Sequence, residues 1–197
     1  TVSTIAELIF YYQSGFKDCT YAVPITFEKW KKLALNESIN LSSVNFLTDD
    51  LQTVFAINEE AKRLNTSVNL YLKIDSGAGR AGSQPKSERL LALAKFVNGA
   101  SNLNLIGLLT HAGQSYHTSD AEQKQEIVYQ EIRSIVNSAS ASGDAMIKRL
   151  LGTELSVKNY TGYRSLLAEF NNLKGIDVRQ RVRQICYSLK GVFYGNF

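Results

Sequence analysis

The feature that most constrains the fold is an alternation, through about residue 138, between strand-like runs and segments of helical periodicity. We expect strands near 20–25, 43–47, 67–75 and 103–111, each followed by a helix. This order is typical of βα units, whose strands pair in parallel and whose crossovers are right-handed. Because a complete (β/α)8 barrel takes about 250 residues, the sequence predicts an α/β fold: a partial (β/α)8 TIM-type barrel of about four βα units.

Capping residues indicate where the first helices begin. Thr4 and Glu7 form a capping box for a helix before the first strand. Asp49 or Asp50 supplies the N-cap of a later helix. The apolar side of that helix is predicted to hold Leu51, Val54, Phe55, Asn58 and Ala61.

The clearest strand is SVNLYLKI at 67–74, in which apolar and polar residues alternate. Its apolar face is predicted to pack against helices and consists of Val68, Leu70, Leu72 and Ile74. The other face carries Lys73 and, continuing the alternation, Asp75. These two side chains therefore lead toward a more polar environment.

Ser119 and Glu122 form a second candidate capping box before a long helix. The chain changes character after this helix, at about residue 138. SASASGD at 138–144 then resembles a linker, so we expect one domain at 1–140 and a basic, mostly helical tail at 141–197. The arginines of the tail suggest either a nucleic-acid surface or a solvated helix face, and we favour the solvated face because a short basic run is seldom enough to bind nucleic acid.

No segment approaches the roughly 20 apolar residues of a membrane span. The opening residues lack the basic region and the cleavage site of a signal peptide, so we expect a cytoplasmic protein with no membrane partner. Cys19 and Cys186 are too few and too far apart for a disulfide framework or a CxxC pair, and we interpret both as ordinary thiols.

A glycine-rich segment, GAGRAG at 77–82, directly follows the clearest strand. Its spacing matches the dinucleotide fingerprint GxGxxG, in which glycines let a pyrophosphate approach a helix N-terminus. Pro85 postpones the helix, and the next strand ends in Thr110 and His111 where the fingerprint needs an acidic residue. The dinucleotide interpretation is therefore disfavoured, whereas a turn without any ligand stays open.

Polar residues also gather after the next strand, in LLTHAGQSYH at 108–117. In barrels, the carboxyl ends of the strands and the loops after them form the active-site face, so His111 and Tyr116 are candidate site residues. The alternative is that this histidine only satisfies a buried hydrogen bond and that the tyrosine caps the core.

Taken together, LKIDSGAGRAG at 72–82 and GLLTHAGQSY at 107–116 resemble the D-serine dehydratase and D-threonine aldolase-like lyases. These lyases belong to the alanine-racemase-like, fold type III group of pyridoxal phosphate enzymes. The segment at 3–25 resembles the part of the family just before these motifs, so the resemblance covers about residues 1–138. It implies a pyridoxal-phosphate-dependent lyase whose small-molecule substrate is a β-hydroxy D-amino acid.

The resemblance also implies roles for individual residues. Lys73, Arg80 and His111 would be catalytic, with Lys73 and Asp75 in the wall near the cofactor. Tyr116, His111 and Arg80 would bind the cofactor, with His111 beside the pyridine ring and Tyr116 near its nitrogen. Complete family members also use zinc, which activates the substrate hydroxyl as a leaving group. We assign no metal ligand in this chain.

The sequence departs from the family pattern at several places. The family's Schiff-base lysine lies upstream of this segment, Gln114 replaces a histidine of the HAGHSY-type motif, and the downstream phosphate-binding and zinc-binding segments are not recognisable. We therefore expect an incomplete fragment without appreciable lyase activity. The rival hypothesis is a non-catalytic interaction or regulatory protein built on a half barrel. A visible absorbance of an internal aldimine would favour the enzyme. The oligomeric state stays open, with a homodimer as one option.

Overall fold

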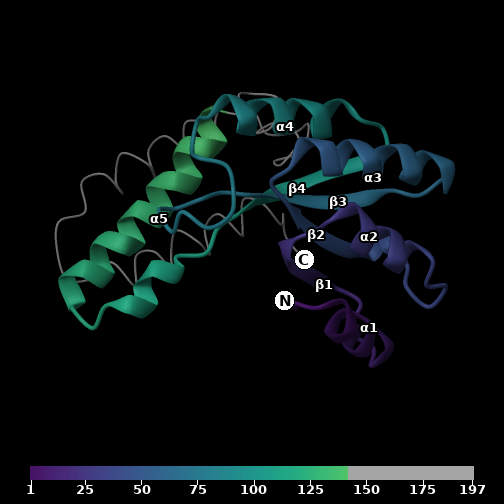
Figure 1. Ribbon diagram of the computed structural model, residues 1–197, viewed down its shortest axis with the longest axis horizontal. Coiled ribbons are helices and arrows are strands. Elements are labelled where there is room, and N and C mark those ends of the chain that lie inside the picture. Colours follow the sequence, from purple (N-terminus) through teal and green to yellow (C-terminus); the bar gives the residue numbers. More distant parts are fainter. Residues whose placement is uncertain (142–197) are drawn as a thin grey trace, which may run out of the picture. The chain divides into compact units, whose positions relative to one another are not determined.

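A parallel sheet forms the centre of the computed structural model, which describes residues 1–141. Its strands are β1 (Cys19–Pro24), β2 (Val44–Thr48), β3 (Val68–Lys73) and β4 (Leu103–Leu109), and they pair in sequence order (Figure 1). This arrangement confirms the predicted α/β class, the parallel pairing and the order of a partial barrel. The pairing of β1 shifts register between Tyr21 and Pro24, as expected where proline cannot donate to the ladder.

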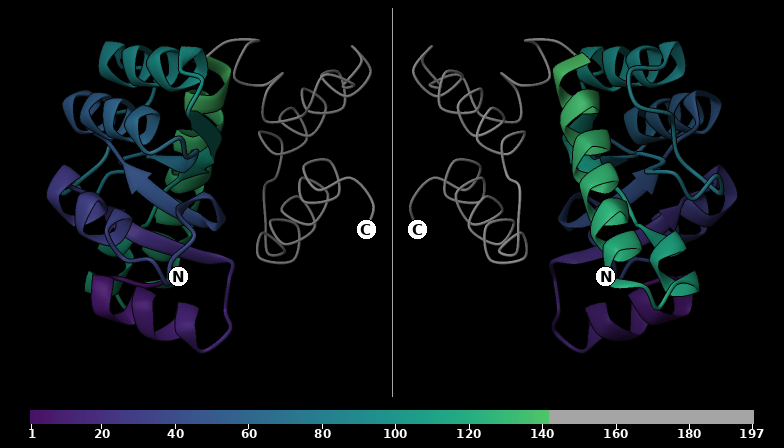
Figure 2. Two further views of the ribbon diagram at one scale, coloured as in Figure 1. Left: turned by 90° about the vertical axis from the view of Figure 1, so that its right-hand side faces the viewer. Right: turned by 90° about the vertical axis from the view of Figure 1, so that its left-hand side faces the viewer.

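The helices are α1 (Ile5–Gln13), α2 (Phe27–Ala34), α3 (Leu51–Arg63), α4 (Glu88–Gly99) and α5 (Ala121–Ala141). Helices α2, α3 and α4 lie side by side along one face of the sheet, and α5 lies at the end where β4 finishes (Figures 1 and 2). None of the helices in residues 1–141 is long and apolar enough to cross a membrane.

The core lies between the sheet and these helices. The alternating apolar residues of β3 are completely buried, as the sequence predicted. Opposite them, the helices contribute Trp30, Leu33, Val54, Ile57, Leu90, Leu93 and Val97, all of which are also inaccessible to solvent. Burial on this scale makes the sheet–helix layer the main source of stability.

The predicted helix starts hold for α1 and α3. Thr4 and Glu7 form the capping box, and the Asp50 carboxylate accepts the Thr53 N–H at 2.7 Å. The expected apolar face of α3 was wrong at Phe55, which is 52% exposed, because its ring leans outward against Phe96 of α4 at a centroid distance of 5.9 Å. The buried position is Ile57.

Two expectations about α5 are also corrected. The side chain that accepts a helix-start N–H belongs to Asp120, not Ser119, since the Gln123 N–H donates to the Asp120 carboxylate at 2.7 Å. The helix continues through Ala141, so the first residues of the expected linker are helical. The rest of that linker and the basic tail lie outside the described residues.

Candidate functional site at the carboxyl ends of β3 and β4

The carboxyl ends of β3 and β4 lie side by side because the two strands are parallel. The ladder extends one residue past β3, where the Ile74 N–H donates to the Leu109 carbonyl at 2.9 Å. The side chains of Lys73 and Asp75 are only 7% and 6% exposed. Two charged groups are thus buried at the end of the sheet that sequence analysis predicted to hold the site.

Asp75 organises the glycine-rich turn that follows β3. Its carboxylate accepts the N–H groups of Gly77 at 2.9 Å and Gly79 at 3.1 Å, together with the side-chain amide of Gln84 at 2.9 Å. The Gly82 N–H donates to the carboxylate of Asp49 at 2.7 Å. Because carboxylates already hold these N–H groups, they are not free to bind a pyrophosphate, and the dinucleotide interpretation fails on this geometry.

Gly82 is required where this turn closes back on the strand. Its φ is 111°, and an added Cβ would stand 2.6 Å from the Asp75 nitrogen and 2.7 Å from the Ile74 carbonyl carbon. Only glycine adopts this conformation without strain. The backbone conformation therefore requires the last glycine of the GAGRAG motif.

The loop after β4 brings His111 and Tyr116 together. Their ring centroids are 5.6 Å apart, and both side chains are exposed, Tyr116 by 75%. Gln114 connects this loop to the β3 turn, since its side-chain amide donates to the Ser76 carbonyl at 3.1 Å. Arg80 is exposed on the turn after β3 and forms no ion pair within residues 1–141. That Arg80, His111 and Tyr116 bind one cofactor, as the resemblance implies, stays a prediction.

Burial and the neighbouring charges have opposing effects on the pKa of Lys73. Burial lowers the pKa of Lys73, and the positive charge of Arg80 lowers it further. Glu131 of α5 and the carboxylates of Asp75 and Asp49 act in the opposite direction. Burial and Arg80 thus favour the neutral amine of Lys73, whereas these carboxylates favour its ammonium form.

Glu131 is a residue of this site that sequence analysis missed. Burial raises the pKa of its carboxyl group, whereas the hydrogen bond from the Ala112 N–H and the charges of His111 and Lys73 lower it. A signal existed in the sequence, because Glu131 lies four residues from Ile127 and from Ile135, on the apolar side of α5. An acidic residue on such a side is a candidate for a buried role.

Several buried polar atoms at this end of the sheet have no hydrogen-bond partner. They are the hydroxyl oxygens of Ser76, Ser83 and Thr110 and the side-chain oxygen of Gln114. Buried polar groups are normally paired, so such a group of atoms indicates a place for a polar ligand. Within residues 1–141, no three His, Cys, Asp or Glu side chains lie close enough to hold a metal ion.

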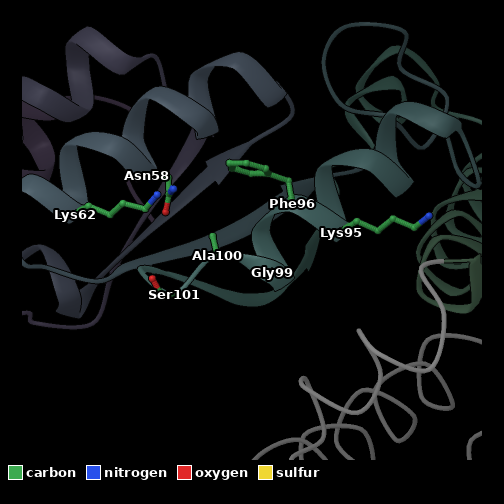
Figure 3. A pocket seen from close by; sticks show the side chains of 7 residues that line it. All are labelled: Asn58, Lys62, Lys95, Phe96, Gly99, Ala100 and Ser101. Carbon is green, nitrogen blue, oxygen red and sulfur yellow. The ribbon is translucent and has the colours of Figure 1, made fainter.

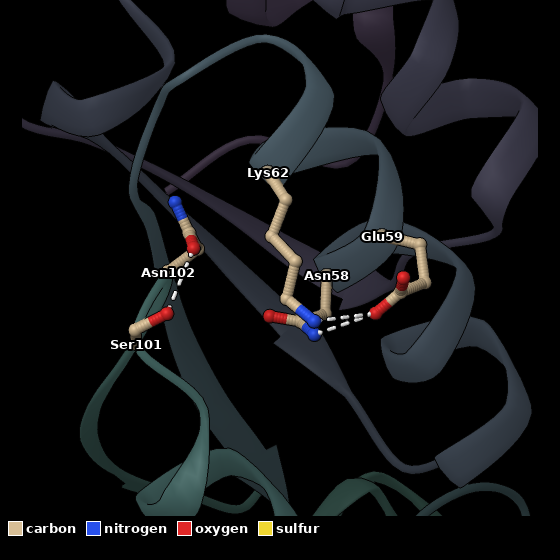
Figure 4. Close-up of polar contacts among 5 residues, drawn as sticks. All are labelled: Asn58, Glu59, Lys62, Ser101 and Asn102. Atoms are coloured by element: carbon tan, nitrogen blue, oxygen red, sulfur yellow. Dashed lines mark hydrogen bonds and ion pairs between the residues drawn. The ribbon is translucent and has the colours of Figure 1, made fainter.

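A separate groove of about 440 Å³ lies near the start of β4, between the last turns of α3 and α4 (Figure 3). Three of its polar side chains pair with neighbouring residues that do not line it (Figure 4). Lys62 and the Asn58 amide both donate to Glu59, at 2.7 and 3.1 Å, and Ser101 donates to Asn102 at 3.0 Å. None of the predicted site residues lines this groove.

The four-stranded parallel sheet and its helices form part of a barrel of the fold type III class, the class expected from the two motifs. The chain belongs to the family described as the alanine racemase N-terminal domain, whose model matches residues 1–153.

Similar proteins and a similar solved structure support this family assignment. The chain is 29% identical over 139 residues to a D-serine dehydratase of Dictyostelium discoideum, covering 67% of this chain and 35% of that protein. It is 27% identical over 105 residues to a 3-hydroxy-D-aspartate aldolase of Paracoccus denitrificans, covering 52% and 27%. The crystal structure of an alanine racemase-like protein from Idiomarina loihiensis superposes with a TM-score of 0.62 at 29% identity, covering 71% and 36%. The chain thus spans about a third of the length of these proteins.

Proposed function

We propose that this chain is part of the cofactor-binding barrel of a pyridoxal-phosphate-dependent lyase that acts on β-hydroxy D-amino acids. The observation that carries the proposal is the set of buried, unpaired polar atoms at the carboxyl ends of β3 and β4, beside Lys73 and His111. The named relatives include a dehydratase and an aldolase of this substrate class, and the chain shares their family.

The residues at this end of the sheet suit the chemical groups of the cofactor and of an amino acid substrate. Arg80 offers a planar cation for a phosphate or carboxylate group. His111 and Tyr116 offer an aromatic surface and hydrogen-bonding groups for a pyridine ring. When bound, pyridoxal phosphate acts as an electron sink at the substrate α-carbon.

The chain's own residues would bind and orient the ligand. Lys73 in its ammonium form would hold an anionic group of the ligand, since its burial removes competing water. The hydroxyl groups of Ser76, Ser83 and Thr110 would complete their hydrogen bonds with polar atoms of the ligand. Zinc has no fitting set of ligands within residues 1–141, so we derive no role for it here.

The test measures binding of pyridoxal phosphate to the full chain by fluorescence. Arg80→Ala and Tyr116→Phe should each weaken binding, the arginine change by about tenfold or more, because a charged hydrogen bond contributes about 1.5–3 kcal/mol. Lys95→Ala at the distant groove is the matched control and should bind like the parent chain. Equal binding in Arg80→Ala and in the control would contradict the proposal.

Product release adds a second measurement. With pyridoxal phosphate and zinc in excess, pyruvate or glycine formation is followed from D-serine and D-threonine. We expect cofactor binding without appreciable turnover, as for a chain that supplies only part of the site. Turnover that disappears in His111→Ala would show that this chain is a complete enzyme.

A second candidate, a non-catalytic interaction protein, is favoured by one observation. Phe10, Tyr11 and Phe16 lie together near α1 and are 64%, 44% and 63% exposed. Exposed apolar clusters often mark interaction surfaces. This candidate predicts that Arg80→Ala changes nothing measurable, whereas Phe10→Ser abolishes association with a partner.

A further inference from the structure

Gln114 connects the two loops of the strand-end site. Its side-chain nitrogen Nε2 donates to the Ser76 carbonyl at 3.1 Å, which joins the loop after β4 to the turn after β3. The loop after β4 is itself held by its backbone, since the Gly113 N–H donates to the His111 carbonyl at 2.9 Å. Both ends of the Gln114 side chain are therefore held in place.

The contact between Gln114 and Ser76 lies in a covered part of the site. Ser76 is only 2% exposed. Gln130 of α5 lies against the neighbouring Gly77, because a Cβ added to that glycine would stand 2.6 Å from the Gln130 side-chain nitrogen. Helix α5 thus helps to keep water from the turn that Gln114 contacts. A hydrogen bond in such surroundings is stronger, and its loss more costly, than one in water.

The hydrogen bond to Ser76 determines which way the Gln114 amide faces. A backbone carbonyl oxygen only accepts hydrogen bonds, so the nitrogen of the amide must face Ser76. The amide oxygen Oε1 is therefore directed away from that carbonyl. It is buried, and no donor in residues 1–141 pairs with it. Because an amide oxygen also only accepts, this position needs a donor from a ligand.

The neighbouring unpaired atoms indicate the chemistry of that ligand group. The hydroxyl oxygens of Ser76 and Thr110 are buried at the same end of the sheet and also lack a partner within the described part of the chain. A hydroxyl group of a ligand suits all of these atoms, because it donates one hydrogen and accepts through its lone pairs. An ammonium group only donates, so it would satisfy the amide oxygen but not the hydrogens of the two hydroxyl groups.

We propose that Gln114 is a specificity-determining residue, whose amide oxygen accepts a hydrogen bond from the β-hydroxyl group of the amino acid substrate. The substrate class rests on the proposed function, whereas the orientation and the burial of the amide do not. A site that hydrogen-bonds a substrate hydroxyl discriminates against an analogue without it, because the buried acceptor then stays unpaired. Gln114 thus selects β-hydroxy D-amino acids over analogues that lack the hydroxyl group.

The experiment compares D-serine with D-alanine, which lacks only the β-hydroxyl group. Binding of each amino acid to the isotope-labelled full chain is measured by NMR titration, with and without pyridoxal phosphate. The parent chain should bind D-serine about tenfold more tightly than D-alanine, as expected for one buried hydrogen bond. Gln114→Met keeps an unbranched side chain without the amide, and should reduce this ratio to about one by weakening the binding of D-serine alone.

The matched control is Gln125→Met, the same change at an exposed glutamine of α5, which should leave both affinities unchanged. A second measurement follows the side-chain amide resonance of Gln114 in the parent chain. D-serine should shift this resonance, whereas D-alanine should leave it nearly unchanged. This measurement decides the question if urea unfolding shows that Gln114→Met does not fold.

Equal binding of D-serine and D-alanine by the parent chain would overturn the proposal, because recognition would then rest on the ammonium and carboxylate groups that the two amino acids share. No binding of D-serine in either condition would also overturn it. If Gln114→Met weakened the binding of both amino acids by the same factor, Gln114 would only hold the two loops together. The titration without pyridoxal phosphate needs no cofactor, so a failure to select D-serine is separate from a failure of the chain to bind pyridoxal phosphate.

Discussion

The polar groups at the two ends of the sheet differ in how fully they are hydrogen-bonded. Near the start of β4, Asn58, Lys62 and Ser101 of the α3–α4 groove donate to the neighbouring Glu59 and Asn102, and the buried Asn58 oxygen has no partner. At the carboxyl ends of β3 and β4, several buried oxygens are unpaired, and a lysine and a glutamate have pKa values shifted by burial. The first end resembles a structural support, whereas the second has the properties of a ligand site.

The connections explain this difference. The chain returns from α3 to β3 through residues 64–67 and from α4 to β4 through residues 100–102, which leaves little room for anything but turns. The connection from β3 to α4 occupies residues 74–87. A longer loop can place side chains that are not needed to close the turn, and barrels concentrate chemistry at this end for that reason.

The largest effect expected from this comparison is at a glycine. Gly82→Ala should destabilise the fold by about 3–5 kcal/mol, because the new Cβ meets the backbone of β3 at a φ that only glycine tolerates. Gly99→Ala, at the groove, meets no atom within 4 Å and should leave stability unchanged or raise it by about 0.5 kcal/mol. The measurement is the free energy of unfolding in urea. Equal losses at the two glycines would remove the distinction between the two ends.

A smaller effect is expected for the buried polar side chains. Asp75→Ala should cost about 2–3 kcal/mol of unfolding free energy, since three hydrogen bonds to a charged group are lost together. Asn58→Leu should change it by less than about 1 kcal/mol, because the Asn58 oxygen has no partner and Glu59 keeps its bond to Lys62. Urea unfolding of both variants sharpens the comparison, and a larger loss at Asn58 than at Asp75 would reverse it.

Local signals made much of the fold predictable. The strands and the caps at Thr4 and Asp50 are determined by residues close in sequence, and the structure confirms them. Sequence alone did not predict whether a side chain is buried where burial depends on a residue distant in sequence. Phe55 has the spacing of a core residue, yet its ring packs outward against Phe96.

The candidate site was predictable to a similar extent. The contact between His111 and Tyr116 lies within one short segment, which the motif already singled out. Glu131 reaches the site only because α5 docks against two loops, one of them more than fifty residues away in sequence. The unpaired oxygens were equally hidden, because the absence of a partner is a property of packing and not of residue type.

The smallest expected effect tests whether every charged residue at the carboxyl end belongs to the site. Asp50 follows β2 and caps α3, and the hydrogen bond from the Thr53 N–H is the main cause that lowers the pKa of its carboxyl group. Asp50→Ala should cost about 1 kcal/mol at neutral pH, the usual contribution of an N-cap. Since the pKa is depressed in the folded state, this contribution is present above the ordinary pKa of aspartate and is lost as the pH falls through the folded value.

The matched change is Ser87→Ala, which removes the uncharged cap of α4. Its cost should be similar in size but independent of pH, because serine does not titrate in this range. Thermal or urea unfolding across an acidic pH series measures both variants against the parent chain. Neither change should alter pyridoxal phosphate binding. If Asp50→Ala weakened binding as much as Arg80→Ala does, the ligand site would extend to β2, and the division between supporting and binding residues would have to be drawn one strand further along the sheet.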